Sequence, residues 1–182
     1  MDTIRAKSSL LVLVDYQARL MPAIHDAARA SANAVLLAQA AKILGIPVLG
    51  TEQNPTKLGP NVEALRVLCD EIVEKMHFDA CADGLLDAIQ TSANGARQIV
   101  VAGCEAHVCL LQTALGLLRA GKQVWVVANA CGSRKPQDHD AAMHRLSHAG
   151  AIIVTHEMVA FEWLGSCEHP GFREVLELIK SG

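Results

Sequence analysis

The stretch that decides the fold is Ile99-Val-Val-Ala-Gly103-Cys-Glu-Ala-His-Val-Cys109-Leu-Leu-Gln-Thr-Ala-Leu-Gly-Leu-Leu-Arg-Ala120. Its four apolar residues at 99–102 are typical of a buried strand, and Gly103 permits a sharp turn. Good helix formers follow from about His107, which puts Cys109 in the first helical turn. Unpaired backbone N–H groups and the helix dipole favour a thiolate there. Because a helix terminus contributes only about 0.3–1 kcal/mol, a reactive Cys109 needs a nearby cation and a proton acceptor.

The composition predicts one domain, spanning residues 1–182, with a large apolar core. Of the 182 residues, 51% are hydrophobic and 3% are aromatic. A core of Ala, Val, Leu and Ile suits a parallel sheet covered by helices. The net charge is −3, so no basic excess favours a membrane surface. The same charge, with few aromatic side chains to stack on bases, disfavours nucleic acid as a partner.

Cysteine usage and hydropathy predict a cytoplasmic protein. The six cysteines lack the spacing of a secreted disulfide framework, and no Cys-x-x-Cys pair indicates structural zinc. Most of them are expected to be buried thiols. No apolar run approaches the roughly 18 residues of a membrane span, and Asp15 ends the first run. The cysteines are Cys69, Cys81, Cys104, Cys109, Cys131 and Cys167.

Apolar runs alternate with helical segments along the whole chain. Strands are predicted at 8–14, 46–51, 71–75, 98–102, 122–128 and 151–154. Helices are predicted at 28–44, 62–69, 83–93, from about 107, and at 138–149, 157–164 and 173–180, with Asp83 as an N-cap and residues 94–95 as a stop. This alternation predicts an α/β fold: a Rossmann-like three-layer αβα sandwich with a parallel six-stranded sheet.

Three chemically capable residues follow the first, third and fourth predicted strands: Asp15, Lys75 and Cys109. Right-handed crossovers bring the carboxyl ends of parallel strands to one edge of a sheet, so we expect these residues to meet. Lys75 as an ammonium can stabilise a thiolate, while Asp15 can take the thiol proton and return it to a leaving amine. Taken alone, Asp15 could equally be a turn residue and Lys75 a solvated lysine.

Four motifs make the chain similar to the isochorismatase-like cysteine hydrolase superfamily, which includes nicotinamidases, N-carbamoylsarcosine amidases and ureidoacrylate amidohydrolases. They are Leu13-Val-Asp15-Tyr-Gln17, Thr51-Glu-Gln-Asn-Pro55, Lys75-Met-His-Phe-Asp-Ala-Cys81 and the segment from Gly103 to Ala114. The resemblance implies the isochorismatase-like hydrolase fold. It also implies a catalytic triad of Asp15, Lys75 and Cys109.

The resemblance further implies a cis peptide at Cys104–Glu105 that orients the backbone N–H groups of Glu105 and Cys109 as an oxyanion hole. Five other residues are candidates for binding substrate because they lie in or beside the loops that follow the strands. A solvated loop and structural histidines are the alternative interpretations. The five are Gln17, Glu52, His77, Phe78 and His107.

Departures from the family pattern bear on the substrate. Nicotinamidases carry an Asp-x-His metal motif after the second strand, where this chain has Thr51-Glu52-Gln53, so no metal and no cofactor are expected. Asn129 replaces the family's usual aspartate after the fifth strand. Because true isochorismatases lack the nucleophilic cysteine, their vinyl-ether reaction is disfavoured here. The motifs look more like isochorismatase-domain proteins of poorly defined substrate.

The sequence therefore predicts a metal-independent hydrolase of a small amide, acting through a covalent Cys109 adduct. One alternative is a catalytically silent protein that keeps the fold for oligomer formation or ligand binding. Another is a thiol redox protein that uses Cys109 with Cys104 or Cys131. The leucines around the helix after Cys109 also predict self-association into a homodimer or higher homo-oligomer.

Overall fold

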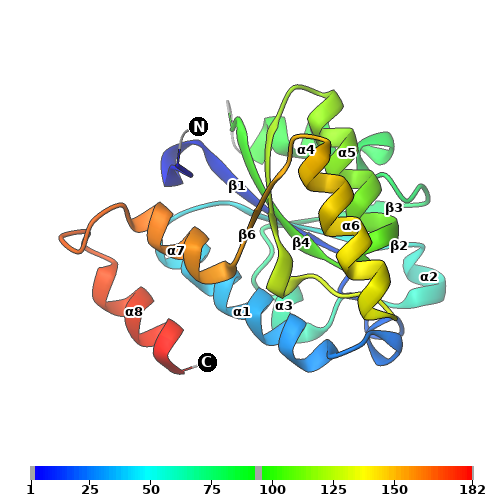
Figure 1. Ribbon diagram of the computed structural model, residues 1–182, viewed down its shortest axis with the longest axis horizontal. Coiled ribbons are helices and arrows are strands. Elements are labelled where there is room, and N and C mark those ends of the chain that lie inside the picture. The colour runs from blue at the N-terminus through cyan, green and yellow to red at the C-terminus, as the bar shows by residue number, and fades with distance from the viewer. Residues whose placement is uncertain (1–2, 93–95, 182) are drawn as a thin grey trace.

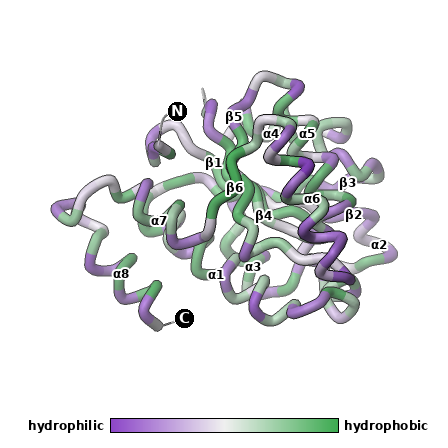
Figure 2. Tube along the Cα trace, in the orientation of Figure 1, coloured by the Kyte–Doolittle hydropathy of each residue, from purple (hydrophilic) through white to green (hydrophobic). Residues whose placement is uncertain are grey.

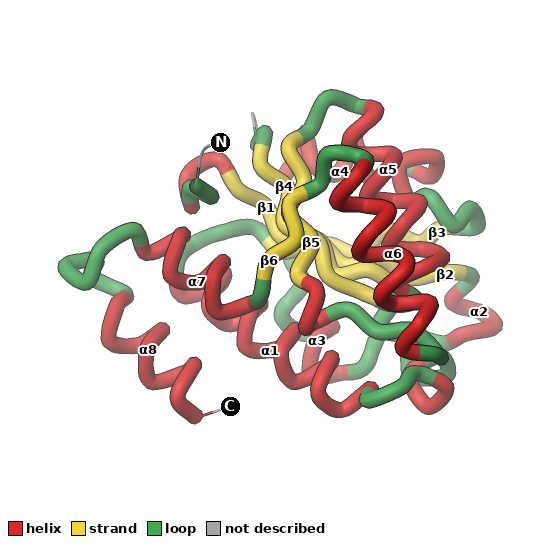
Figure 3. The backbone as a smooth tube through the Cα atoms, in the orientation of Figure 1, coloured by secondary structure: helices red, strands yellow, loops and turns green. Residues whose placement is uncertain are grey.

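The computed structural model describes residues 3–92 and 96–181, and its centre is a twisted parallel sheet between two layers of helices (Figures 1 and 3). The strand order is β3-β2-β1-β4-β5-β6, and every neighbouring pair is parallel. This confirms the predicted α/β sandwich. The strands are β1 (Ser9–Val14), β2 (Val48–Gln53), β3 (Glu71–Lys75), β4 (Gln98–Gly103), β5 (Gln123–Val127) and β6 (Ile152–Val154).

The helices divide between the two faces of the sheet. One face is covered by α4 (Leu85–Ser92), α5 (Leu111–Arg119) and α6 (Pro136–His148). The other is covered by α1 (Ala27–Ile43), α3 (Glu63–Arg66) and α7 (His156–Leu164). The last helix, α8 (Phe172–Ser181), packs outside this layer against α1 and α7 (Figure 1).

The core lies on both faces of the central strands. Every residue of β1 and β4 is buried, and Figure 2 shows the sheet as the most hydrophobic part of the chain. Leu10 and Val12 pack on one face and Leu11 and Leu13 on the other, as the two-residue period of a strand requires. Continuous apolar runs are thus explained by a sheet that is covered on both sides.

Several predicted boundaries differ from the structure. A short helix, α2 (Pro55–Leu58), lies in the loop after β2, where none was predicted. Asp83 does not cap α4; its Oδ2 instead accepts hydrogen bonds from the backbone N–H groups of Met76 and His77, each at 2.7 Å. Helix α4 begins at Leu85, after Gly84. The predicted stop at residues 94–95 lies outside the described residues.

The stretch that contains Cys109 also differs in detail. Gly103 does not serve a turn: a Cβ there would lie 2.4 Å from the Val14 carbonyl oxygen, so glycine is required by the close approach of β4 to β1. The segment Ala106–Leu110 forms a π-helical turn, and α5 begins only at Leu111. Cys109 therefore lies in the first helical turn, as predicted, but this turn is π-helical and precedes α5.

The helix after Cys109 is buried largely within the chain itself. Leu110, Leu111 and Leu117 are buried against the sheet and its neighbouring helices, and Leu115 and Leu118 are half-buried. This corrects the sequence argument for self-association, because the three layers already cover most of that apolar surface. Among the described residues, the structure contains no helix with both the length and the hydropathy needed to cross a membrane.

Tyr16 anchors the chain just after β1. Its ring is fully buried, and its hydroxyl donates a hydrogen bond to the Ala130 carbonyl oxygen at 2.5 Å. The segment after β1 is thereby tied to the segment after β5, across the central strands.

Candidate active site

A buried ion pair lies at the carboxyl edge of β1, β2 and β3. Lys75 Nζ is 2.7 Å from Asp15 Oδ2, and both side chains are 0% exposed. Asp15 follows β1 with a φ of 52°, in the left-handed region, and Lys75 is the last residue of β3. Since an isolated charge is costly to bury, each of these side chains depends on the other.

The intervening strand supplies two further contacts to this pair. The Thr51 hydroxyl donates to Asp15 Oδ1 at 2.6 Å, and Lys75 Nζ donates to Gln53 Oε1 at 2.7 Å. Alternate residues of a strand share a face, so the two side chains of β2 point to the same cluster. The contacts of Thr51 and Gln53 with the ion pair were not predicted from the sequence. Their spacing of two residues on the strand between β1 and β3 is the signal that could have found them.

Cys109 completes the cluster. The residue is 6% exposed, and its thiol lies close enough to the Asp15 carboxyl and the Lys75 ammonium for both to act on its pKa. The structure thus brings the three expected residues together from three separate segments. The nucleophile candidate contacts both the proton acceptor and the cation that its chemistry needs.

The Cys109 thiol is protonated at rest. Burial, the largest cause, and the Asp15 charge raise its pKa from the ordinary value of 9.0 to about 12, while the Lys75 charge acts to lower it. A pKa of about 12 leaves roughly one thiol in 100,000 ionised at pH 7. Desolvation thus outweighs the effect of the lysine on this thiol, in keeping with the prediction that Cys109 needs a proton acceptor. A nucleophile forms only when a neighbouring group takes the proton.

The remaining cysteines do not share these surroundings. All six are free thiols, and burial also raises the pKa of Cys69, Cys81 and Cys131 to about 12. Burial likewise raises the pKa of Cys104. The pKa alone therefore does not single out Cys109. Cys81 lies beside the exposed pair of Asp79 and Arg119, whereas Cys109 lies beside a fully buried ion pair.

The segment before Cys109 is held from two sides. The Cys104–Glu105 peptide bond is cis, as the resemblance implies. The buried Cys104 donates its backbone N–H to the Val14 carbonyl oxygen at 2.9 Å. Glu105 Oε2 accepts hydrogen bonds from Arg134 Nε at 2.8 Å and from the Arg134 backbone at 3.3 Å. These bonds connect the segment to the ends of β1 and β5.

Two of the expected substrate-binding residues have other partners. The amide nitrogen of the fully buried Gln17 donates to the carbonyl oxygens of Gln53 and Gly59, at 3.0 and 2.6 Å. The Glu52 carboxylate accepts from the Asn61 backbone at 2.9 Å and from Arg66 Nε at 3.2 Å. These contacts give Gln17 and Glu52 structural partners within the chain, and their role toward a substrate stays a prediction.

The other three candidates lie nearer the surface. His77 is exposed, and its Nδ1 is 2.9 Å from Asp83 Oδ1. Phe78 is 50% exposed. His107 is half-buried, with Nδ1 3.0 Å from Ser133 Oγ. None of these contacts joins the three side chains to the ion pair, so their role toward a substrate stays a prediction.

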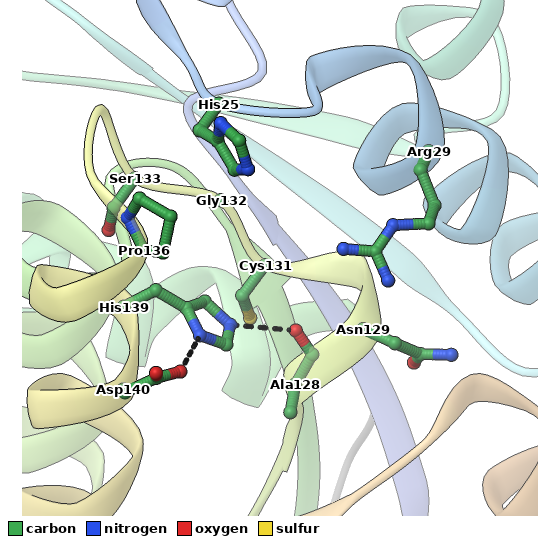
Figure 4. A pocket seen from close by; sticks show the side chains of 10 residues that line it. All are labelled: His25, Arg29, Ala128, Asn129, Cys131, Gly132, Ser133, Pro136, His139 and Asp140. Atoms are coloured by element: carbon green, nitrogen blue, oxygen red, sulfur yellow. Dashed lines mark hydrogen bonds and ion pairs between the residues drawn. The ribbon is translucent and has the colours of Figure 1, made fainter.

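A separate cavity of about 320 Å³ lies at the carboxyl end of β5 (Figure 4). It exposes Cys131, not Cys109, to its interior. Asn129, at the position of the family's usual aspartate, accepts the His156 backbone N–H at 3.0 Å, so a neutral amide fills that place by hydrogen bonding. The cavity is lined by His25, Arg29, Ala128, Asn129, Cys131, Gly132, Ser133, Pro136, His139 and Asp140.

Comparison with known proteins now identifies the family. A model of the isochorismatase domain matches residues 9–158. The chain belongs to the isochorismatase family. Among isochorismatase relatives, isochorismatase domain-containing protein 1 of Danio rerio is 36% identical over 173 residues, which cover 95% of this chain and 61% of that protein. This chain therefore spans less than two thirds of the length of that relative.

Solved structures of the isochorismatase fold agree with this assignment. The MAR1 ribonuclease from Caenorhabditis elegans is 33% identical, with a TM-score of 0.92 and coverage of 98% of this chain and 93% of that one. YcaC from Pseudomonas aeruginosa, in a structure with hexane-2,5-diol and covalent acrylamide, is 25% identical, with a TM-score of 0.83 and coverage of 99% and 96%. The chain has the fold of the isochorismatase-family hydrolases.

Proposed function

We propose that this isochorismatase-family protein is a metal-independent cysteine hydrolase that cleaves the C–N bond of a small amide. The observation that carries the proposal is the position of the Cys109 thiol beside the buried ion pair of Asp15 and Lys75. A nucleophile beside a base that a third group orients is the general arrangement of covalent catalysis. Thr51 and Gln53 stand where nicotinamidases carry metal ligands, and both bind the ion pair instead.

The first half of the proposed reaction makes a thioester. Cys109 gives its proton to the Asp15 carboxylate while its sulfur attacks the carbonyl carbon. Lys75 remains an ammonium and offsets the negative charge that develops near it. Asp15 then passes the proton to the leaving nitrogen, the C–N bond breaks, and the amine departs.

The second half consumes one water. The water oxygen attacks the thioester carbon as Asp15 takes a proton from it, and the C–S bond breaks. Asp15 returns that proton to the sulfur, the acid product leaves, and the resting thiol is restored. The backbone N–H groups of Glu105 and Cys109 are our proposed oxyanion hole for both tetrahedral intermediates. The ion pair between Glu105 and Arg134 supports this role by holding the segment in place.

Two relatives bear on the class of reaction. Acrylamide is an electrophile that carries an amide group, and its covalent form in the YcaC structure supports a nucleophilic site in that protein. The name of the Caenorhabditis elegans relative favours ribonuclease activity as a second candidate. This chain has a net charge of −3 and 3% aromatic residues, which gives little basis for holding a phosphate backbone.

The test is a screen of small amides, ureas and carbamates for ammonia or amine release, with a single-stranded RNA as a parallel substrate. We expect turnover of at least one amide and its loss in Cys109→Ala. Intact-mass spectrometry of the quenched reaction should show an acyl adduct on wild-type protein. The matched control is Cys167→Ala, because Cys167 is an exposed thiol in a distant loop.

Each outcome decides between the candidates. Amide turnover that survives Cys109→Ala would contradict the mechanism. Cleavage of RNA without amide turnover would favour the ribonuclease candidate. A reversible disulfide from Cys109 to Cys104 or Cys131 after peroxide treatment, with no hydrolysis, would favour the redox alternative.

A further inference from the structure

We propose that Thr51 and Gln53 are positioning residues that assemble Asp15 and Lys75 into one base–cation unit beside Cys109. This inference rests on the proposed function, since it assigns roles within that site. Asp15 and Lys75 come from β1 and β3, which do not pair with each other; β2 lies between them. The ion pair therefore reaches across the end of β2, whose side chains are placed to contact both of its members.

Gln53 orients the lysine. Lys75 Nζ donates to Asp15 Oδ2 and Gln53 Oε1, both at 2.7 Å, and to the His77 carbonyl oxygen at 3.4 Å. An ammonium has three N–H bonds, and here three acceptors face them. These protein acceptors hold Lys75 in place, so its role in the site is to supply a positive charge at a fixed position beside Cys109.

The orientation of the Gln53 amide is itself determined by its neighbours. Its Nε2 donates to the Met76 carbonyl oxygen at 2.8 Å, so its Oε1 must face the lysine. Its backbone N–H donates to Gln17 Oε1 at 2.8 Å. Register supports the same arrangement, since Gln53 lies directly opposite Lys75 in the pairing of β2 with β3.

Thr51 orients the carboxylate. Its hydroxyl donates a hydrogen bond to Asp15 Oδ1 at 2.6 Å. The Asp15 backbone N–H donates in turn to the Thr51 carbonyl oxygen at 3.2 Å. With Oδ2 bound to Lys75, both carboxylate oxygens have a fixed partner, and rotation of the group is blocked. The lone pairs that remain are therefore presented to the Cys109 thiol in one orientation.

The experiment measures alkylation of Cys109 by iodoacetamide against pH, quantified on the Cys109 peptide by mass spectrometry, so no substrate is required. Gln53→Met keeps the volume and removes the acceptor. We expect it to slow alkylation at pH 7.5 by about tenfold, because the positive charge is held less closely to the sulfur. Gln53→Glu places a negative charge beside the Lys75 ammonium and partly cancels its charge. This variant should slow alkylation at least as much as Gln53→Met. Gln112→Met, on the exposed side of α5, is the matched control and should leave the rate unchanged.

For Thr51 the readout is rescue by the conservative variant. Thr51→Val keeps the shape and removes the hydroxyl, so the turnover number on an accepted amide should fall about tenfold with little change in KM. Thr51→Ser restores the hydroxyl and should recover most of the loss. Thr91→Val, at an exposed position of α4, is the control. Melting temperature is measured on every variant, so that rates are compared only between folded proteins.

The outcomes separate this inference from the proposed function. Wild-type alkylation profiles in both Gln53 variants, or a Thr51→Ser protein as impaired as Thr51→Val, would overturn the positioning roles. If Gln53 variants shift the alkylation profile but no amide is ever turned over, the positioning of the charge stands and the hydrolase proposal fails.

Discussion

The protonated state of Cys109 has a measurable consequence for its reactivity. The pKa of Cys109 is raised to about 12. At any pH below this value, the thiolate fraction increases tenfold when the pH rises by one unit. Iodoacetamide labelling of Cys109 should therefore rise steadily from pH 7 to pH 10 without a plateau. Peptide mass spectrometry gives the profile, with the exposed Cys167 as an internal reference. A plateau below pH 9 would show that a resting thiolate exists after all.

The two charged partners of Cys109 should have opposite effects on the thiol. Lys75→Ala removes the positive charge, so the pKa of Cys109 should rise and alkylation at neutral pH should slow. Asp15→Asn removes the negative charge that raises this pKa, so alkylation should be unchanged or faster. Both variants should lose amide turnover, since Asp15 carries the proton and Lys75 the charge.

The folding of both variants is checked by urea unfolding. Breaking a buried ion pair typically costs 3–5 kcal/mol, so urea unfolding is measured alongside the alkylation. If folded Lys75→Ala protein alkylates like the wild type, Lys75 is a structural residue and the proposed triad fails.

The positions of the candidate site residues could be predicted from the sequence, but their protonation and hydrogen bonding could not. Asp15, Lys75 and Cys109 could be predicted because each follows a strand, and strand topology alone brings such positions together. The raised pKa of the Cys109 thiol could not be predicted, because it depends on how completely the three layers exclude water from the sulfur. The roles of Thr51 and Gln53 required the order of the strands.

At the scale of single elements, the contact between β4 and β1 depends on a residue without a side chain. Gly103→Ala would place a Cβ 2.4 Å from the Val14 carbonyl oxygen, so β4 must shift away from the strand that carries Asp15. We expect a loss of about 1–3 kcal/mol in the free energy of unfolding and slower alkylation of Cys109. Gly45→Ala, at a positive φ with open space around it, is the control: it should lower stability without changing the thiol. Equal effects of both variants on alkylation would contradict the close-approach argument.

The loop after β3 should lose stability in acid. Hydrogen bonds from the His77 backbone and side chain lower the pKa of Asp83 from 3.8 to about 2. A lowered pKa in the folded state contributes stability that is present above pH 3.8 and is lost as the pH falls toward 2. Urea unfolding midpoints of wild type should therefore fall over this interval more steeply than those of Asp83→Asn. Parallel curves for the two proteins would show that the loop contributes nothing to acid stability.

Element boundaries show where sequence signals compete. The run at β3 was predicted at its observed position, because charged residues delimit it on both sides. The π-helical turn at Ala106–Leu110 was not predicted, because the same helix-forming residues occur in α-helical and π-helical turns. Asp83 carries the residue type of an N-cap, but the nearby N–H groups of Met76 and His77 bind it instead.

The assembly of whole molecules is the next scale, and here we propose self-association on grounds that differ from the sequence argument. Helix α5 is covered within the chain, but Met158 and Phe161, one turn apart on α7, remain 49% and 39% exposed. Exposed large apolar side chains favour an interface between copies. Light scattering at micromolar concentration should give a mass above 19.4 kDa. A monomer mass would contradict the proposal, and Phe161→Lys should lower the measured mass if α7 is the interface.

Tyr16 gives the protein a natural optical reporter. It is the only tyrosine in the chain, it directly follows Asp15, and burial raises its pKa well above 10.0. Its phenolate absorbance can therefore develop only when water reaches the ring, that is, when the segment behind Asp15 separates from Ala130. Stopped-flow jumps to alkaline pH would therefore record, without any added dye, how often the Tyr16 segment separates from Ala130 in solution.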